Sequence, residues 1–261
     1  MSILDEIILY KKQELQWKKQ QMPLDELKKS AYFHRSTFSL IENIERKRGV
    51  AVIAEFKRKS PSKGIINDRA DVVNTTLGYM NCGVAGISVL TDEKYFGGSP
   101  DDLKIIRSQV SVPILRKDFI VDAYQVYEAK AMGADVILLI ASCLSSVELY
   151  DLSQLASSLG LESLFEIHDA SEIEKLPPKA RLVGVNNRNL KNFEVNLNHS
   201  QQICKLLPEG CLKIAESGIH SVEEAKLLAN AGFDAFLIGE FFMKHASPDA
   251  ACRDFMNALT M

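Results

Sequence analysis

Several features that would define a function class are missing from this chain of 261 residues. Its five cysteines, Cys82, Cys143, Cys204, Cys211 and Cys252, include no CxxC pair. This scatter argues against a zinc site or a disulfide framework and favours free thiols in a reducing cytoplasm. Neither GxxxxGK nor GxGxxG occurs. The common nucleotide-binding loops are therefore absent.

Long apolar runs and charge of a single sign are also missing. The longest wholly apolar run, VILLIA at 136–141, is far shorter than the roughly 18 residues that indicate a membrane helix. The N-terminus lacks the apolar core of a signal peptide. The 31 lysines and arginines are interleaved with 34 acidic residues, so no basic arm suits a nucleic acid. We expect a cytoplasmic protein with no membrane and no nucleic-acid partner.

From residue 50 onward, short aliphatic or β-branched runs alternate with segments of helical spacing. Strands that are buried on both faces and each followed by a helix pair in parallel. Eight such units in about 210 residues predict a closed (β/α)8 TIM barrel, and a doubly wound open sheet is the alternative. The predicted strands are 50–56, 85–90, 112–117, 134–141, 161–167, 181–186, 212–217 and 234–239.

The first 47 residues differ in kind from the rest. Their apolar spacing predicts one or two amphipathic helices with a break near Pro23, and the residues of the apolar face are Ile3, Leu4, Ile7, Ile8, Leu15 and Trp17. Both signs of charge occur on the polar face, so we expect the apolar stripe to pack on the main domain. Residues 1–261 are thus predicted to form a single barrel domain, with 1–47 as an N-terminal helical extension over one end.

Polar side chains gather where the predicted strands end. A barrel places all these ends around one mouth, where active sites are built. Lysines and glutamates that converge there shift each other's pKa values, which permits acid and base roles near neutral pH. Of the five histidines only His168 falls near a strand end, and none is assigned a role. The strand-end residues are Glu55, Lys57, Thr91, Asp92, Lys117, Ser142, Glu166, Asn186, Arg188, Glu216, Ser217, Gly239 and Glu240.

Small residues after the seventh and eighth strands indicate a phosphate site. ESGI at 216–219 and IGE at 238–240 occupy the usual place for barrel phosphate sites built from backbone N–H groups. The alternative is that these glycines only permit tight turns. Lys57, Lys59 and Ser60 would add charge and hydrogen bonds from the first loop, and SPSKG at 60–64 has the composition of a mobile lid. We expect a phosphorylated small molecule as the partner.

Six motifs occur in order at barrel spacing: AEFKRKSPSKG, PILRKDFI, LFEIHD, GVNNRNL, IAESGI and LIGEFFM. Together they resemble the indole-3-glycerol phosphate synthase family over essentially the whole chain, including the N-terminal extension. The resemblance implies a carbon–carbon lyase of tryptophan biosynthesis. Its substrate would be 1-(2-carboxyphenylamino)-1-deoxyribulose 5-phosphate, converted to indole-3-glycerol phosphate with loss of carbon dioxide and water. The resemblance implies no metal and no organic cofactor.

The resemblance also implies roles for single residues. Lys117 matches the general acid that protonates the keto oxygen, and we expect its pKa to be lowered. Lys57 matches the residue that holds the substrate carboxylate, and Glu166 matches the acid/base of the dehydration, although Lys57 could also serve in the later proton transfers. The positioning residues would be Glu55, Asn186, Arg188 and Glu216, and the phosphate cradle would be Ser60, Ser217, Gly218, Gly239 and the backbone of Glu240. Phe119 would pack on the anthranilate ring or else belong to the core.

Two positions depart from the family pattern. Asn189 replaces an aspartate in the motif expected as NxRDL, which puts the charge that would hold Arg188 in doubt. Glu240 lies where a serine often occupies the phosphate loop. Because a carboxylate repels phosphate, we expect the side chain of Glu240 to turn away.

Three other functions stay open at this point. A phosphoribosylanthranilate isomerase should have a cysteine base and an aspartate acid on strands one and six, where this chain has Glu55 and Asn186. A Schiff-base aldolase would use Lys117 as the nucleophile. A barrel that only binds a phosphorylated ligand would show no turnover. The oligomeric state is open as well, with a monomer expected and a weak homodimer as the alternative.

Overall fold

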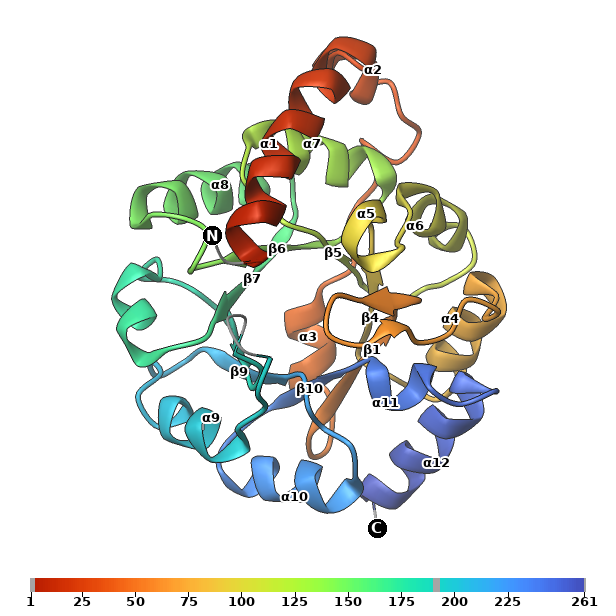
Figure 1. Cartoon of the computed structure of the whole chain (residues 1–261), viewed down its shortest axis with the longest axis vertical. Helices are drawn as coiled ribbons and strands as arrows, with labels where there is room; N and C mark the ends of the chain where they lie inside the picture. The colour runs from red at the N-terminus through yellow and green to blue at the C-terminus, as the bar shows by residue number, and fades with distance from the viewer. Residues whose placement is uncertain (1–2, 190–192, 261) are drawn as a thin grey trace.

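Eight parallel strands close into a barrel in the computed structural model, which describes residues 3–189 and 193–260 (Figure 1). β1 pairs with both β4 and β10, so the barrel has no free edge, and the alternative of an open sheet is wrong. All eight predicted strands are confirmed: β1 (Ala51–Phe56), β4 (Gly86–Leu90), β5 (Ile114–Lys117), β6 (Val136–Ile140), β7 (Glu162–Ile167), β8 (Leu182–Asn186), β9 (Leu212–Glu216) and β10 (Ala235–Ile238).

Helices surround the barrel on the outside (Figure 1). Most begin at a polar residue whose side chain accepts a hydrogen bond from a backbone N–H of the first turn, as Asp71 and Ser145 do. None of the helices in the described part of the chain is long and apolar enough to cross a bilayer. The outer helices are α4 (Val72–Asn81), α5 (Glu93–Phe96), α6 (Pro100–Arg107), α7 (Ala123–Met132), α8 (Ser146–Ser158), the 3-10 helix η1 (Ala170–Lys175), α9 (Leu197–Cys204), α10 (Val222–Asn230), α11 (Glu240–Met243) and α12 (Pro248–Thr260).

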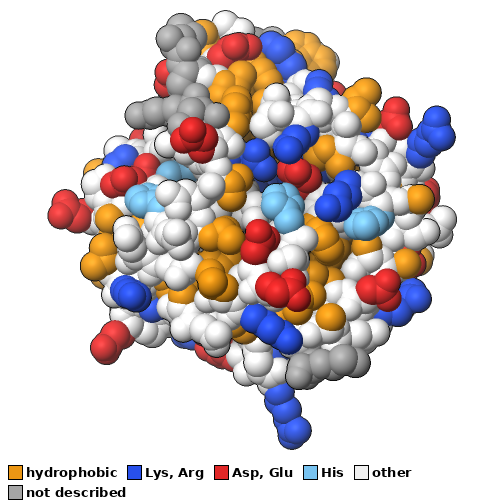
Figure 2. All heavy atoms as spheres, turned by 60° about the horizontal axis from the view of Figure 1, so that its bottom comes forward, with side chains coloured by type: hydrophobic (Ala, Val, Ile, Leu, Met, Phe, Trp, Pro, Cys, Tyr) orange, Lys and Arg blue, Asp and Glu red, His pale blue; other side chains and the backbone are white. Residues whose placement is uncertain are grey.

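The surface between these elements mixes side chains of every kind. On the face shown in Figure 2, apolar side chains lie in short patches between acidic and basic ones. This mixture agrees with the interleaved charges of the sequence.

The N-terminal segment forms three helices, α1 (Ile3–Gln21), α2 (Leu24–Leu27) and α3 (Leu40–Glu45), and they reach both ends of the barrel. The expectation of an extension over one end is therefore wrong. α1 supplies apolar side chains to the pocket at the carboxyl ends of the strands. α3 lies at the opposite end, where Leu40 and Ile44 pack on the apolar interior of the barrel (Figure 1).

Trp17 does not belong to the buried stripe of α1, contrary to prediction, because 61% of it is exposed. Ile7 and Leu15 are buried as expected, and the side chain between them is Lys11. These three residues recur every four positions and so share one face of the helix. Burial of Lys11 is tolerated because its ammonium group pairs with carboxylates of the barrel, as described below.

Asp135, directly before β6, joins the N-terminal segment to the bottom of the barrel. Its carboxylate is fully buried and accepts four hydrogen bonds. Oδ1 accepts from Nη2 of Arg35 at 2.6 Å and from the backbone N–H of Phe38 at 2.8 Å. Oδ2 accepts from Nη1 of Arg107 at 2.7 Å and from the backbone N–H of Ile114 at 2.8 Å. Arg107 is itself buried, and the Asp135 carboxylate balances its positive charge.

We predict that Asp135→Ala lowers the free energy of unfolding by about 3–5 kcal/mol, because it leaves the buried Arg107 cation unpaired. Urea denaturation of the purified variant measures this change. Asp25→Ala is the matched control, since the side chain of Asp25 is 91% exposed, and it should alter stability by less than about 0.5 kcal/mol. Equal stability of the two variants would contradict the assignment.

Candidate active site

A single pocket at the carboxyl ends of the strands contains every residue assigned to the site by the family resemblance, whereas Lys59, expected to add charge to the phosphate site, does not line it. Thr91, Asp92 and Ser142, which also end strands, do not line it. The sequence therefore identified the rim of the barrel, and the fold selects which rim residues face inward. The assigned residues that line the pocket are Glu55, Lys57, Ser60, Lys117, Phe119, Glu166, Asn186, Arg188, Glu216, Ser217, Gly218, Gly239 and Glu240.

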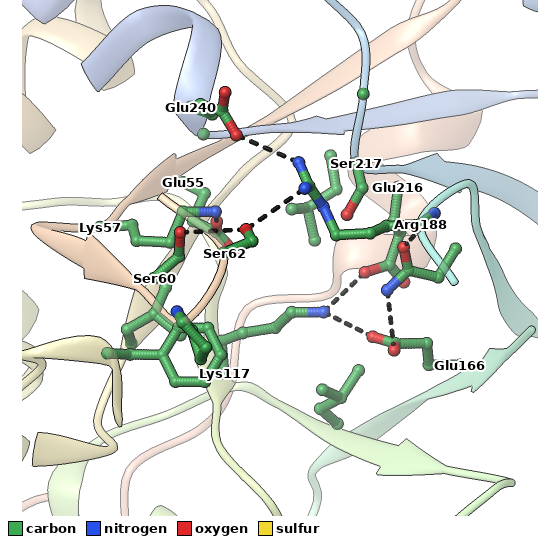
Figure 3. A pocket seen from close by; sticks show the side chains of 18 of the residues that line it. Glu55, Lys57, Ser60, Ser62, Lys117, Glu166, Arg188, Glu216, Ser217 and Glu240 are labelled. Carbon is green, nitrogen blue, oxygen red and sulfur yellow. Dashed lines mark hydrogen bonds and ion pairs between the residues drawn. The ribbon is translucent and has the colours of Figure 1, made fainter. Parts of the chain in front are cut away.

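The Lys117 ammonium group lies between two carboxylates (Figure 3). Its Nζ is 2.7 Å from Oε2 of Glu166 and 2.6 Å from Oε2 of Glu216. Lys117 ends β5, Glu166 lies in β7 and Glu216 ends β9. Asn186 at the end of β8 donates from Nδ2 to Oε1 of Glu166 at 3.0 Å. Four strands thus build one hydrogen-bonded cluster.

The charge of this cluster overturns one expectation from the sequence. Burial alone would lower the pKa of Lys117, but the carboxylates of Glu166 and Glu216 outweigh it and raise the pKa above the ordinary value. The expectation of a lowered pKa is wrong because carboxylates, rather than other cations, contact the ammonium group. Burial would raise the pKa of Glu166, yet Lys117 holds it well below its usual range. Lys117 is held protonated and Glu166 is held ionised.

Glu216 behaves differently from Glu166. The pKa of Glu216 is raised to about 7, mainly by burial. The Lys117 cation opposes this rise, and the negative charge of Glu166 adds to it. Oε1 of Glu216 has no hydrogen-bond partner among the described residues. Gly184 in β8 makes room for this oxygen, since a Cβ there would lie 2.0 Å from it. The site therefore contains a carboxyl group that gains and loses a proton near neutral pH.

The loop after β1 covers one side of the pocket. SPSKG forms the turn of a small antiparallel hairpin, β2 (Lys59–Ser60) and β3 (Gly64–Ile65). Lys57 before it pairs with Glu55, with Nζ and Oε1 2.6 Å apart. Lys59, expected to face the ligand, donates instead to the backbone carbonyl of Lys94 at 3.1 Å.

Arg188 connects this hairpin to the opposite wall of the pocket (Figure 3). Its Nη1 donates to Oγ of Ser62 at 3.2 Å, and its Nη2 donates to Oε2 of Glu240 at 3.1 Å. Lys63 also lies near Glu240, at 3.6 Å. The expectation that Glu240 turns away is wrong: it faces the pocket because two cations attract it. Asn189, beside Arg188, shares backbone hydrogen bonds with Phe193 and Glu194, while Leu190 of the same motif lies outside the described residues.

Ser217 and Gly218 form a sharp turn after β9. Their φ angles are 66° and 68°. Gly218 is required there, because a Cβ would lie 2.2 Å from Cγ1 of Val195. Ser217 is a non-glycine residue in the left-handed region, a conformation that costs about 1–3 kcal/mol and concentrates at functional sites.

The rest of the pocket wall is apolar. Phe119 packs near Phe96, with ring centroids 5.9 Å apart. Ile3, Leu4 and Ile7 of α1 line the same pocket. A flat aromatic group of a ligand would find apolar contacts here, while its charged groups would meet the lysines and Arg188.

Two polar side chains of the site were missed from the sequence. Ser62 was considered only as part of a lid. His168 was given no role, yet its Nε2 lies 3.1 Å from Oε1 of Glu166. Residues two apart on a strand share a face, so the spacing of Glu166 and His168 was a signal available in the sequence.

The fold and the site define a class: a (β/α)8-barrel enzyme whose pocket is lined by lysines and glutamates. The family model described as indole-3-glycerol phosphate synthase matches residues 4–255. The chain belongs to this family and is an enzyme of its type, a carboxy-lyase.

Relatives with the family's name match nearly the whole chain. The indole-3-glycerol phosphate synthase of Carboxydothermus hydrogenoformans is 43% identical, over 95% of this chain and 97% of its own. That of Bacteroides thetaiotaomicron is 41% identical, over 98% of each chain. The solved structure of 3-hexulose-6-phosphate synthase from Salmonella typhimurium has a TM-score of 0.66 at 14% identity and covers 81% of this chain and 99% of its own. This likeness concerns the fold alone.

We predict that Gly184→Ala lowers kcat/KM at least about tenfold, because the new Cβ displaces the Glu216 carboxylate from Lys117. Steady-state kinetics measure the loss. Gly210→Ala is the control: nothing lies within 4 Å of the added Cβ, although Gly210, unlike Gly184, has a positive φ that strains an alanine. The control should lose stability and keep full activity. A kcat/KM of Gly184→Ala equal to that of the control would show that the Glu216 position tolerates the methyl group.

We predict that Glu216 titrates near neutral pH, well above the ~4.3 of an ordinary glutamate. Carbon-13 NMR of glutamate carboxyl groups, assigned with Glu216→Gln, measures the titration. In Lys117→Met the pKa of Glu216 should rise further, because removal of the cation removes the group that stabilises the ionised form. A pKa that falls in Lys117→Met would disprove this account of the cluster.

Proposed function

We propose that Lys117, Glu166 and Lys57 carry the chemistry of the indole-3-glycerol phosphate synthase reaction in this chain. That reaction closes the ring of 1-(2-carboxyphenylamino)-1-deoxy-D-ribulose 5-phosphate and releases carbon dioxide and water. One observation carries the proposal: the Lys117 ammonium group lies within 2.7 Å of both Glu166 and Glu216 at the mouth of the barrel. A proton donor and a base are thus placed side by side.

Lys117 acts first, as the general acid. The aromatic carbon attacks the keto carbon, and the electron pair of the carbonyl moves to its oxygen, which takes a proton from the ammonium group. Loss of the carboxylate as carbon dioxide then returns its bonding electrons to the ring. The raised pKa of Lys117 guarantees that the proton is present. Donation becomes easier when the substrate draws a carboxylate away from Nζ, since that carboxylate stabilises the ammonium form.

Glu166 serves in the dehydration, in which the ring carbon next to the nitrogen loses a proton and the neighbouring hydroxyl leaves as water. Its lowered pKa supports a role as proton acceptor. Asn186 donates to Oε1 and limits the rotation of the carboxylate. Lys57 directly follows β1 and is paired with Glu55. We assign Lys57 to the substrate carboxylate, because a cation at that wall attracts it before it leaves.

The phosphate group of the substrate would bind where the turns after β9 and β10 meet the hairpin that follows β1. Ser217 and Gly218 supply a tight turn there, and Gly239 precedes α11. Ser60 lies in the hairpin on the same pocket. The pairing of Glu240 with Arg188 balances the charge of this carboxylate and so reduces its repulsion of phosphate.

The Schiff-base alternative is disfavoured by the same cluster. Schiff-base formation requires a neutral amine, and two carboxylates hold Lys117 protonated. We also propose a cytoplasmic monomer. The free state of all five cysteines supports the location, and the monomer stays a prediction.

We predict that Lys117→Ala and Glu166→Gln each reduce kcat by about 10²–10⁴-fold, the usual contribution of a general acid or base. A fluorescence assay of indole-3-glycerol phosphate formation measures turnover. Lys104→Ala, a surface variant with a half-exposed lysine, is the control and should keep full activity. Borohydride added with substrate should leave the parent active. Covalent trapping of Lys117 would refute acid catalysis and favour an aldolase.

A further inference from the structure

His168 lies next to Glu166 but is not among the residues that line the pocket. It follows β7 directly, and its side chain is only 13% exposed. Its Nε2 lies 3.1 Å from Oε1 of Glu166, and its Nδ1 lies 4.0 Å from Oε2 of Glu172 in η1. The imidazole ring is therefore held between two carboxylates.

The backbone of His168 is fixed on both sides. Its N–H donates to Oε2 of Glu172 at 2.7 Å. Its carbonyl oxygen lies 3.3 Å from Nε2 of His199 in α9. A side chain placed by two neighbouring elements keeps its direction, so the contact of the ring with Glu166 is built into the fold.

Three groups contact the Glu166 carboxylate, and they differ in kind. Lys117 donates a hydrogen bond to Oε2 from the pocket, and Asn186 donates one to Oε1. Nε2 of His168 lies at ion-pair distance from Oε1, and its ring makes no hydrogen bond among the described residues. Burial would lower the pKa of His168, but Glu166, followed by Glu172, outweighs it and raises the pKa above the ordinary value. The imidazole is thus charged over a wider range of pH than an isolated histidine. The charged and titratable groups that face this pair are Lys117, Glu172, Glu216, His199 and Cys143.

We infer that His168 is a positioning residue that keeps the Glu166 carboxylate ionised and oriented for its proton transfer. The inference rests on the role proposed above for Glu166. The imidazolium cation opposes protonation of Glu166. His168 therefore keeps Glu166 ionised even while the substrate interacts with Lys117, the other cation near this carboxylate.

The sign of the effect on pH dependence follows from this arrangement. Activity requires ionised Glu166, so kcat/KM falls on the acid side as this carboxylate gains a proton. Without the positive charge of His168, the ionised carboxylate of Glu166 is less stable, so its pKa rises. The acid limb of the pH profile should then move to higher pH. The alkaline limb depends on Lys117 and should stay in place.

The test compares two substitutions at this position. His168→Gln retains an N–H donor and loses the charge, so we expect the acid limb to shift upward by about one pH unit, with kcat at its plateau within about threefold of the parent. His168→Leu also loses the charge and should shift the acid limb in the same direction. The assay is the formation of indole-3-glycerol phosphate by the full chain from about pH 3, which is below the ~4.3 of an ordinary glutamate, to about pH 9.

His34→Gln is the control, because His34 is exposed in the N-terminal segment and does not line the pocket. A merely structural role for His168 would shift neither limb. Superimposable acid limbs of the parent and His168→Gln, with equal thermal unfolding midpoints, would overturn the inference. If Glu166→Gln kept full activity, the role proposed for Glu166 would fail instead. The two failures are therefore distinct.

Discussion

Closure of eight parallel strands is the constraint on which the rest of this structure depends. Because every strand runs in the same direction, every carboxyl end reaches one mouth. Lys117 thereby meets Glu166, 49 positions away in sequence, and Glu216, 99 positions away. No local segment of the chain contains this cluster. The barrel also explains why one pocket collects residues from so many strands, since all their carboxyl ends lie at the same end of the barrel.

Buried charges occur at both ends of the barrel, and each has a partner. At the bottom, Asp135 neutralises Arg107 and orders the N-terminal segment. At the mouth, Lys11 of α1 lies 3.0 Å from Asp92 and 3.1 Å from Asp118, the residue after Lys117. These pairs join the N-terminal helices to the barrel, because a buried charge without its partner is strongly destabilising. The apolar end of α1 is held over the pocket in this way.

The pocket contains backbone strain and an unsatisfied buried polar atom. Ser217 has a left-handed backbone, and one oxygen of Glu216 lacks a hydrogen-bond partner among the described residues. Lys117 is shared by two carboxylates of opposite pKa shift. Such departures cost stability and concentrate where chemistry occurs. His168 extends this coupled group outward to Glu172, beyond the pocket lining.

The sequence by itself determined the eight strands, the helices between them and the rim of polar residues, because apolar periodicity and strand-end composition are local signals. It also determined the family, through motifs that are contiguous. Only the tertiary structure decided that Lys11 rather than Trp17 is buried on α1 and that Glu240 faces Arg188. It likewise decided the direction of the Lys117 pKa shift and the contact of His168 with Glu166. The physical reason is common to these cases: the charge state and direction of a side chain depend on neighbours that folding brings from distant parts of the chain.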